Sequence, residues 1–313
     1  MEKVDSAPAA EAQPAKTLPH GSALWKRLDD SWRTAKWAAL RWLNRREIAA
    51  VKSAFAEQPL ARILAKYPDI PLKPVRPYLL SGLKRRDRPA AVIRHYAAAA
   101  RILTAEALVE SHTTGVRLLS LPTQAGEITV DLAGQGPLYR EAEWRLVLNV
   151  DRRPVVEMGL AIVEPRLVQF GGSGEVFWIG VLKTVLAGKH GLEDSRALTK
   201  ALEGLRPKAL LLLVAQALAG AFNLSGIFAA SNKGHVFAGD YSLRRRIKAD
   251  YDSFWTESGG NRVSPAVFAL PLVKTQRDPC EYKPNKRAQI RRRQMLEQEI
   301  EKQVREAVAP LLA

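Results

Sequence analysis

The chain has 313 residues, of which 47% are hydrophobic, so it is long enough for a sizeable core and most of it should be globular. Its 48 lysines and arginines against 32 acidic residues give a formal net charge of +16. This excess favours an anionic partner, which can be nucleic acid, a lipid surface or a phosphorylated ligand. The single cysteine, Cys280, excludes an internal disulfide and disfavours a cysteine-rich metal site, so we expect no metal.

The N-terminal segment has two parts. Residues 1–19 are rich in Ala, Pro and Glu, which predicts a disordered tail without the features of a signal peptide. From Leu24 to Leu43 apolar residues recur at helical spacing among basic ones, and four tryptophans fall in the same segment: Trp25, Trp32, Trp37 and Trp42. Such a basic amphipathic helix lies on a membrane surface or packs on its own domain, and packing is the favoured interpretation.

The longest apolar run, residues 209–224, is interrupted by Gln216 and is too short to span a membrane. We therefore expect a cytoplasmic protein. Contact with the inner membrane through the Trp25–Trp42 helix is the peripheral alternative.

The periodicity divides the rest of the chain. Residues 20–111 predict a helical region that contains a proline-rich connector, Pro68 to Pro77, and a helix with His95, expected to be a partly buried, hydrogen-bonded histidine rather than a catalytic one. After Gly115 the period becomes that of strands, and short turns between them favour an antiparallel meander. The expected strands are Val116–Leu121, Glu127–Leu132, Trp144–Val150, Val155–Val163 and Val176–Thr184.

The stretch around residues 207–230 organises the second half of the chain. Pro207 suits the first turn of a helix, and residues up to Phe222 are apolar on every face, so we expect a buried helix followed by a core strand, Ile227–Ala230. A late strand, Val267–Val273, and a basic C-terminal helix from Asn285 follow. Residues 112–313 thus predict an α+β domain with a mixed, mostly antiparallel central sheet flanked by helices.

Cations lie at the start of that buried helix. Arg206 and Lys208 flank Pro207, where free helix N–H groups also favour an anion. A phosphate and an ion pair with Glu203 or another acid are equally open interpretations.

The order of these elements resembles the acyl-CoA N-acyltransferase (GNAT) fold, if a helix forms near Tyr241–Lys248. In that family the loop and helix after the fourth strand bind the CoA pyrophosphate, so the resemblance implies CoA or acyl-CoA as cofactor. The matching candidates are Lys200, Gly204, Leu205, Arg206 and Lys208. The short glycine-rich motif of the family is absent, because the loop is longer here. Glu175 begins the strand before this loop, where such folds sometimes place a base, although an exposed strand-end charge is favoured.

A polar turn follows the core strand. It contains Asn232 and His235, and three carboxylates lie downstream: Asp250, Asp252 and Glu257. A histidine beside carboxylates can act as a general base, which makes His235 and Asn232 catalytic candidates. A turn that fixes its own backbone is the favoured alternative.

Several separated blocks along the chain form a second pattern. They are Arg94-His95-Tyr96, Thr199-Lys200 with Gly204 to Lys208, Ser231-Asn232 with His235-Val236, Asp250 to Asp252 with Phe254-Trp255 and Gly259-Gly260, and Lys286 to Ala288 with Arg291 to Arg293 and Met295-Leu296. These blocks are similar to the VirK/YbjX family, a domain family of unknown function from Gram-negative bacteria. The resemblance covers about Ala50 to Leu296. Glu203 stands where the family leads us to expect histidine, which puts a role for that histidine in doubt. The resemblance implies a link to the bacterial envelope, to virulence and to tolerance of antimicrobial peptides.

Two functions follow from these patterns. The first is an acyltransferase-like enzyme that transfers an acyl group from acyl-CoA to an amine or an envelope precursor. The second is a non-enzymatic basic protein that binds an anionic membrane or nucleic acid. Nucleic acid is less favoured, because the sequence has no RNP-type or helix-turn-helix signature.

Overall fold

The computed structural model describes residues 23–168, 171–185, 188–240, 243–244, 247, 249–276 and 278–313, and the side chains of residues 23–31, 33 and 188–194 lie outside this description. The chain forms two compact units, residues 1–43 and residues 44–313. The first contains helix α1, Ala23–Leu43. The predicted tail, residues 1–19, lies outside the described residues, and the predicted boundary after Ser111 stays a prediction.

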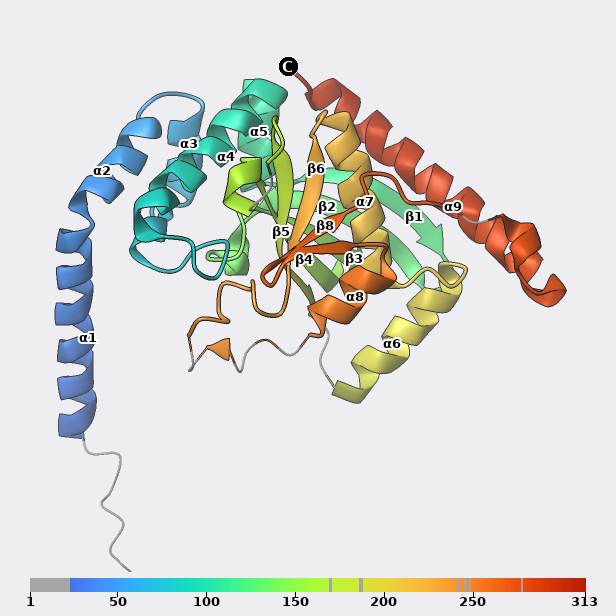
Figure 1. The fold of residues 1–313 in the computed structure, drawn as a ribbon, viewed down its shortest axis with the longest axis horizontal. Coiled ribbons are helices and arrows are strands. Elements are labelled where there is room, and N and C mark those ends of the chain that lie inside the picture. Colours follow the sequence, from blue (N-terminus) through green and yellow to red (C-terminus); the bar gives the residue numbers. More distant parts are fainter. Residues whose placement is uncertain are drawn as a thin grey trace, which may run out of the picture. The chain divides into compact units, whose positions relative to one another are not determined.

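Within the described residues, eight strands form one mixed sheet in the order β1-β2-β3-β4-β5-β6-β8-β7 (Figure 1). All neighbouring pairs are antiparallel except β5 and β6, which are parallel with Val176 opposite Gly226. The strands are β1 (Val116–Thr123), β2 (Gly126–Gly134), β3 (Trp144–Val150), β4 (Arg153–Val163), β5 (Val176–Thr184), β6 (Gly226–Ala230), β7 (Asn261–Ser264) and β8 (Val267–Leu270).

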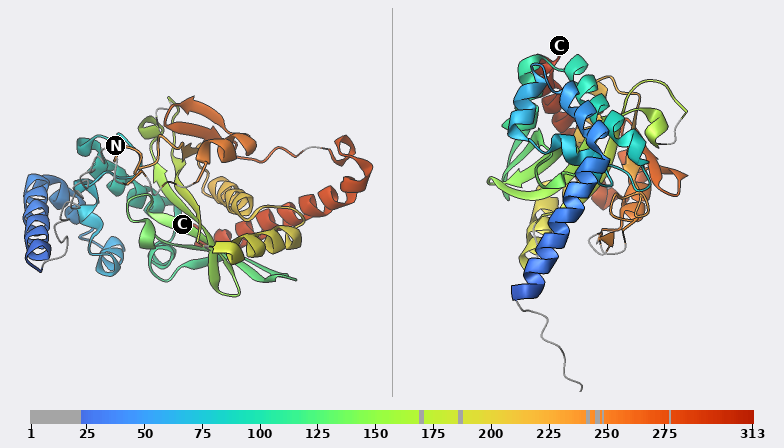
Figure 2. Two further views of the ribbon diagram at one scale, coloured as in Figure 1. Left: turned by 90° about the horizontal axis from the view of Figure 1, so that it is seen from below. Right: turned by 90° about the vertical axis from the view of Figure 1, so that its left-hand side faces the viewer.

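Helices pack against this sheet within residues 44–313. α7 packs on β3 to β6, α9 packs on α7 and β1, and α4 and α5 pack on β4 and β2 (Figures 1 and 2). The helices are α2 (Arg45–Ala54), α3 (Leu60–Lys66), α4 (Arg88–Ile102), α5 (Ala105–Thr113), α6 (Gly188–Ala201), α7 (Pro207–Ala221), α8 (Tyr251–Glu257) and α9 (Pro284–Val308). Among the described residues, no helix combines the length and apolar character needed to cross a membrane.

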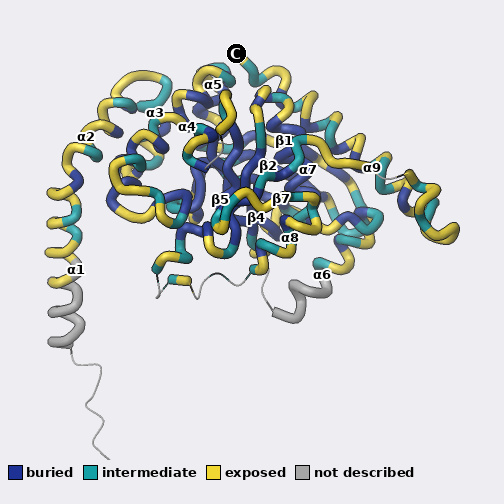
Figure 3. Tube along the Cα trace, in the orientation of Figure 1, coloured by how far each residue is buried: buried dark blue, intermediate teal, exposed yellow. Residues whose placement is uncertain are grey.

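The α+β class and the antiparallel meander are confirmed. β3 and β5 have the predicted bounds, and α7 is buried on nearly every face, as its continuous apolar sequence predicts (Figure 3). His95 is fully buried. β3, β5 and α7 have strong local sequence patterns. They lie in the middle of the sheet or pack on it, where tertiary packing favours the same secondary structure as the local sequence.

Other expectations about secondary-structure elements and their bounds were wrong. The loop expected after β5 contains α6, and the late strand ends at Leu270, because Pro271 lacks the N–H that a ladder needs. The helix expected near Tyr241–Lys248 falls largely outside the described residues, and the helix found between β6 and β7 is α8 instead. β7, whose residues are mostly exposed, gave no alternating pattern.

A buried ion pair lies where the N-terminal helices meet the sheet. Lys73, in the 3₁₀ helix Ile70–Val75, places its Nζ 2.6 Å from Oε2 of Glu143, and both side chains are 0% exposed. The hydroxyls of Tyr78 and Tyr96 donate to the same carboxylate, the latter at 2.7 Å. Burial, followed by the Glu143 charge, raises the pKa of both tyrosines well above its usual value, so both remain protonated donors.

The turn that carries Glu143 rests on two glycines of the sheet. A Cβ at Gly180 would lie 2.0 Å from the Glu141 carbonyl oxygen, and one at Gly159 would lie 2.8 Å from the Ala142 Cβ. The register between β4 and β5 shifts at this point, after Gly159. The turn can therefore lie directly against the backbone of β4 and β5.

Two fully buried histidines connect α4, α5 and the end of β4. His95 Nδ1 accepts the Ile162 N–H at 3.0 Å, so its proton must lie on Nε2, which donates to His112 Nε2 at 3.2 Å. His112 then carries its proton on Nδ1 and donates to the Leu108 carbonyl at 2.9 Å. These bonds require both rings to be neutral. Burial lowers the pKa of His112 to about 3 and that of His95 well below its usual value.

Breaking the buried ion pair should be strongly destabilising. We expect Lys73→Met to lower the free energy of unfolding by about 3–5 kcal/mol, because the Glu143 carboxylate is left buried without its counter-ion. Chemical denaturation followed by circular dichroism measures this loss. The matched control is Arg305→Ala, which removes an exposed i,i+4 pair with Glu301 and should cost about 1 kcal/mol or less. Similar losses in the two variants would contradict the stabilising role of the buried pair.

The histidine pair should make the protein acid-sensitive. Below pH 6.5 the unfolded chain protonates His112, whereas the folded protein resists protonation down to about pH 3, so stability falls as the pH drops through this window. Denaturation at pH 7 and pH 5 should show that His112→Asn, although less stable at pH 7, loses about 2 kcal/mol less than the wild type between these pH values. Equal losses in both proteins would exclude His112 as a source of the acid sensitivity.

Candidate functional site

The strongest candidate site is a cavity of about 610 Å³ at the start of α7. α7 supplies its N-terminal end and one side, α8 contributes its last residues, and α9 and the segment after β8 complete the wall. The lining residues are Gly204, Leu205, Arg206, Ala209, Leu212, Gln216, Phe254, Glu257, Ser258, Gly259, Pro271, Lys274, Thr275, Gln276, Tyr282, Ile290, Arg293, Gln294 and Glu297. Its size lies within the usual range for small-molecule sites.

The local sequence explains how the start of α7 reaches this cavity. Glu203 and Gly204 both have positive φ, and the Gly204 N–H bonds to the Thr199 carbonyl at 2.8 Å, which closes the end of α6. Arg206 is extended as the N-cap residue, makes no side-chain cap, and Pro207 opens the helix. The N–H groups of Lys208 and Ala209 lie in the first turn of α7, before the first N–H group that bonds to a carbonyl within the helix.

Two of the three lining cations, Arg206 and Lys274, are paired with acids on neighbouring elements. Arg206 contacts Glu257 of α8 at 2.8 Å, and both side chains are mostly exposed. Lys274 contacts Glu297 of α9, whose side chain is 3% exposed. Arg293 donates to the Gly204 carbonyl at 3.4 Å. Exposed pairs such as Arg206–Glu257 contribute little to stability, so an anionic ligand can displace Glu257 at small cost.

The predicted cofactor residues separate into two groups. Gly204, Leu205 and Arg206 line the cavity, whereas Lys200 and Lys208 do not. Burial lowers the pKa of Lys208. The ion pair anticipated for Arg206 forms with Glu257, while Glu203 instead contacts Arg292 at 3.1 Å.

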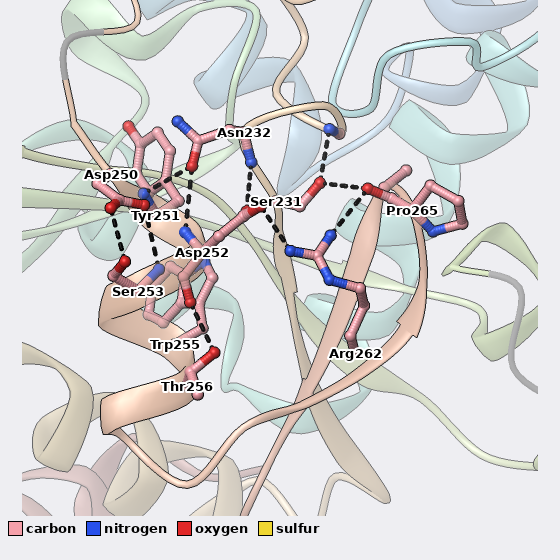
Figure 4. Close-up of polar contacts among 12 residues, drawn as sticks. Ser231, Asn232, Asp250, Tyr251, Asp252, Ser253, Trp255, Thr256, Arg262 and Pro265 are labelled. Atoms are coloured by element: carbon pink, nitrogen blue, oxygen red, sulfur yellow. Dashed lines mark hydrogen bonds and ion pairs between the residues drawn. The ribbon is translucent and has the colours of Figure 1, made fainter.

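The polar turn after β6 is a bracing network (Figure 4). Asn232 Oδ1 accepts the N–H groups of Tyr251 and Asp252 at 2.8 and 3.1 Å, and its Nδ2 donates to the Ala249 carbonyl at 2.8 Å. The Asn232 N–H in turn donates to Asp252 Oδ1 at 2.8 Å. Both polar atoms of the Asn232 side chain thereby hold the start of α8 against the end of β6.

The three carboxylates downstream of the polar turn contact residues other than His235. Asp252 also contacts Arg262 at 2.5 Å, and Asp250 caps α8 by accepting the Ser253 N–H at 3.1 Å (Figure 4). Glu257 contacts Arg206. Among the contacts of the described residues, none joins these three acids to His235.

His235 is almost completely buried, and its ring stacks on that of Tyr251 at 5.6 Å. Burial, with a smaller effect of Arg140, lowers the pKa of His235 to about 4, so it is neutral at pH 7. Its Nδ1 accepts the Phe237 N–H at 3.3 Å, which leaves the proton on Nε2. The ring at neutral pH therefore offers a donor, and its catalytic role stays a prediction.

Glu175 lies far from this turn. It precedes β5, next to Ser225 before the parallel strand β6, whereas Asn232 and His235 follow the opposite end of β6. Its carboxylate pairs with Arg101 of α4. The structure thus keeps Glu175 apart from His235 and Asn232, and outside the lining of the cavity at α7.

Glu297 is a cavity residue that the sequence analysis missed. Its position follows the buried face of α9, seven residues after Ile290 and three before Ile300, where the helical period calls for an apolar side chain. Met295, an apolar residue of the same helix, is by contrast 60% exposed. The sequence signal for this residue was a carboxylate at a position where the helical period predicts an apolar side chain.

Comparison with known proteins supports the family resemblance that the separated sequence blocks predict. The model of the family described as "Protein of unknown function (DUF535)" matches residues 26–306. The chain belongs to this family. It is 28% identical over 239 residues to the uncharacterized protein YbjX of Escherichia coli (strain K12), covering 74% of this chain and 69% of the relative. This confirms the VirK/YbjX resemblance. No solved structure matches the chain.

Proposed function

We propose that this DUF535 protein is an acyltransferase-like protein that binds CoA or acyl-CoA at the start of α7 and transfers the acyl group to an amine. The observation that carries the proposal is the cavity at that helix start, which Arg206, Lys274 and Arg293 line. Cations, free helix N–H groups and an adjacent apolar wall suit a phosphorylated ligand with a long uncharged arm.

The arrangement of strands supports the same proposal. Strands β2 to β5 form an antiparallel meander, β6 adds in parallel beside β5, and α6 and α7 lie in the connection between them. The strands and α7 fit the element order on which the GNAT resemblance rests, whereas α6 lies where that order has a loop. The GNAT-like assignment and the link to the bacterial envelope and virulence remain part of the proposal.

Different residues of the cavity would contact different parts of the ligand. The Ala209 N–H group and the Arg206 guanidinium would hold phosphate oxygens, while Leu205, Leu212 and other apolar residues of the wall would exclude water. When bound, acyl-CoA supplies a thioester whose carbonyl carbon accepts the amine nitrogen, so that the C–N bond forms as the C–S bond breaks and the amine proton passes to the thiolate.

A titration with CoA and acyl-CoAs tests the proposal. A ligand that binds only the folded state raises the free energy of unfolding by about 2.7 kcal/mol at one hundred times its Kd, which a thermal-shift assay detects. We expect Arg206→Ala to weaken CoA binding about tenfold or more, and Lys208→Ala to weaken it less, because Lys208 lies outside the cavity lining. Glu257→Gln should strengthen binding, since it releases Arg206.

Arg305→Ala is the control, because it removes the same charge from the exposed surface of α9 outside the cavity. The absence of a thermal shift with every CoA tested would overturn the proposal. Equal weakening by Arg206→Ala and Arg305→Ala would show that the charge of the surface, and not the cavity, attracts the ligand.

The exposed apolar side chains of α1 favour a second function, binding to an anionic membrane surface. Trp32, Trp42 and Leu43 are 68%, 64% and 52% exposed, and with Ala35 and Ala39, also exposed, they follow one side of the helix. Lys36 lies beside this side of the helix. An apolar face with tryptophans and flanking cations is typical of helices that lie in the membrane interface.

Vesicle co-sedimentation tests this second function. We expect the full chain to bind vesicles that contain phosphatidylglycerol more tightly than pure phosphatidylcholine vesicles, and Trp32→Ser/Trp42→Ser to weaken binding about tenfold or more. The control is Trp37→Ser, which changes a half-buried tryptophan on another side of α1 and should have little effect. Unchanged binding by the double variant would rule out α1 as the membrane-binding element.

A further inference from the structure

A second cavity, of about 630 Å³, lies away from α7. It is formed by the loop from Leu80 to Asp87, the first turns of α4, and the chain from Val163 to Leu167 at the end of β4. It shares no lining residue with the cavity at α7. None of the residues discussed under the proposed function contributes to it.

The floor of this second cavity is apolar. The half-buried Leu83 and Leu167, with the exposed Ala90, present apolar surface to the cavity, and the core residues Leu80, Ala91 and Val163, which are almost completely buried, also line it. An apolar surface that faces a cavity open to water is stabilised by an apolar occupant. A phosphate or a nucleic-acid backbone alone would leave this floor in contact with water.

The rim carries an excess of positive charge. Arg94 and Arg166 reach it from α4 and from the chain after β4, and both bind the same carboxylate, that of Glu164: Arg94 Nη1 contacts Oε1 and Arg166 Nε contacts Oε2. One carboxylate neutralises one of the two guanidiniums. Lys84 adds a third cation to the lining, and the other lining acid, Asp87, lies 3.8 Å from Arg86.

We propose that this cavity binds a single-chain amphiphile with an anionic head group, a carboxylate or a phosphate. The head group lies between Arg94, Arg166 and Lys84, and the alkyl chain covers the apolar floor. The guanidinium planes suit bidentate contact with either head group. The inference goes beyond the proposed function and does not depend on it, because the two cavities have separate walls.

Calorimetric titration of the full chain with dodecyl phosphate and with dodecanoate, both below their micelle concentrations, tests the inference. We expect both to bind and inorganic phosphate, which lacks the chain, to bind at least tenfold more weakly. Dodecyl maltoside, with a neutral head group, and dodecyltrimethylammonium, with a cationic one, should bind at least tenfold more weakly as well. The two anionic ligands separate a phosphate head group from a carboxylate.

Variants of the rim locate the site. Arg94→Ala and Arg166→Ala should each weaken dodecyl phosphate binding about tenfold, and since these side chains are 48% and 75% exposed, neither substitution empties the core. Glu164→Gln should strengthen binding severalfold, because it removes the acid that competes for both guanidiniums. A purely structural role for this triad would not produce a gain. Arg86→Ala, a 77% exposed neighbour outside the lining, is the matched control and should change binding less than twofold.

Three results would overturn the inference. Inorganic phosphate that binds as tightly as dodecyl phosphate would make this a simple anion site. Equal weakening by Arg86→Ala and Arg166→Ala would show a diffuse basic surface in place of the cavity. Binding that survives both Arg94→Ala and Arg166→Ala but is lost in Arg206→Ala would place the amphiphile in the cavity at α7.

Discussion

The structure of residues 44–313 depends on the Lys73–Glu143 ion pair, which lies at the meeting point of four segments. Lys73 comes from a 3₁₀ helix, Tyr78 from the loop that follows, Tyr96 from α4, and Glu143 from the turn before β3. The carboxylate accepts from all three, and Lys73 also donates to the Ala142 carbonyl at 3.3 Å. A buried charge is tolerated only when its hydrogen bonds are made, so these segments must arrive together.

The same polar interior explains why the histidines of α4 and α5 are neutral. Their ring nitrogens complete hydrogen bonds to the Ile162 N–H and the Leu108 carbonyl, and Trp144 packs against both rings at centroid distances of 4.6 and 4.9 Å. The contact between α4, α5 and the sheet is thus polar at this point. Neither of the two histidines lines a candidate cavity.

Sequence periodicity predicted the elements that form the middle of the sheet, because β3, β5 and α7 have local patterns that agree with their final environment. It also directed attention to Gly204 and Arg206, which do line a cavity. It could not predict that Lys73 lies buried in a proline-rich connector, or that Glu257 reaches Arg206, since these partners are 70 and 51 residues apart in sequence. The role of Asn232 was likewise undetermined, because a turn that braces a helix and a catalytic turn use the same residue types.

The glycines under the Glu143 turn have a consequence for which substitutions the sheet tolerates. Gly159 and Gly180 contribute no polar atom to the ion pair, yet a methyl group at either one would meet the turn at 2.8 or 2.0 Å. Since the turn cannot yield on its other side without separating Glu143 from Lys73, alanine at these positions would act as a charge-disrupting mutation. The buried ion pair of the core therefore depends on two residues that have no side chain.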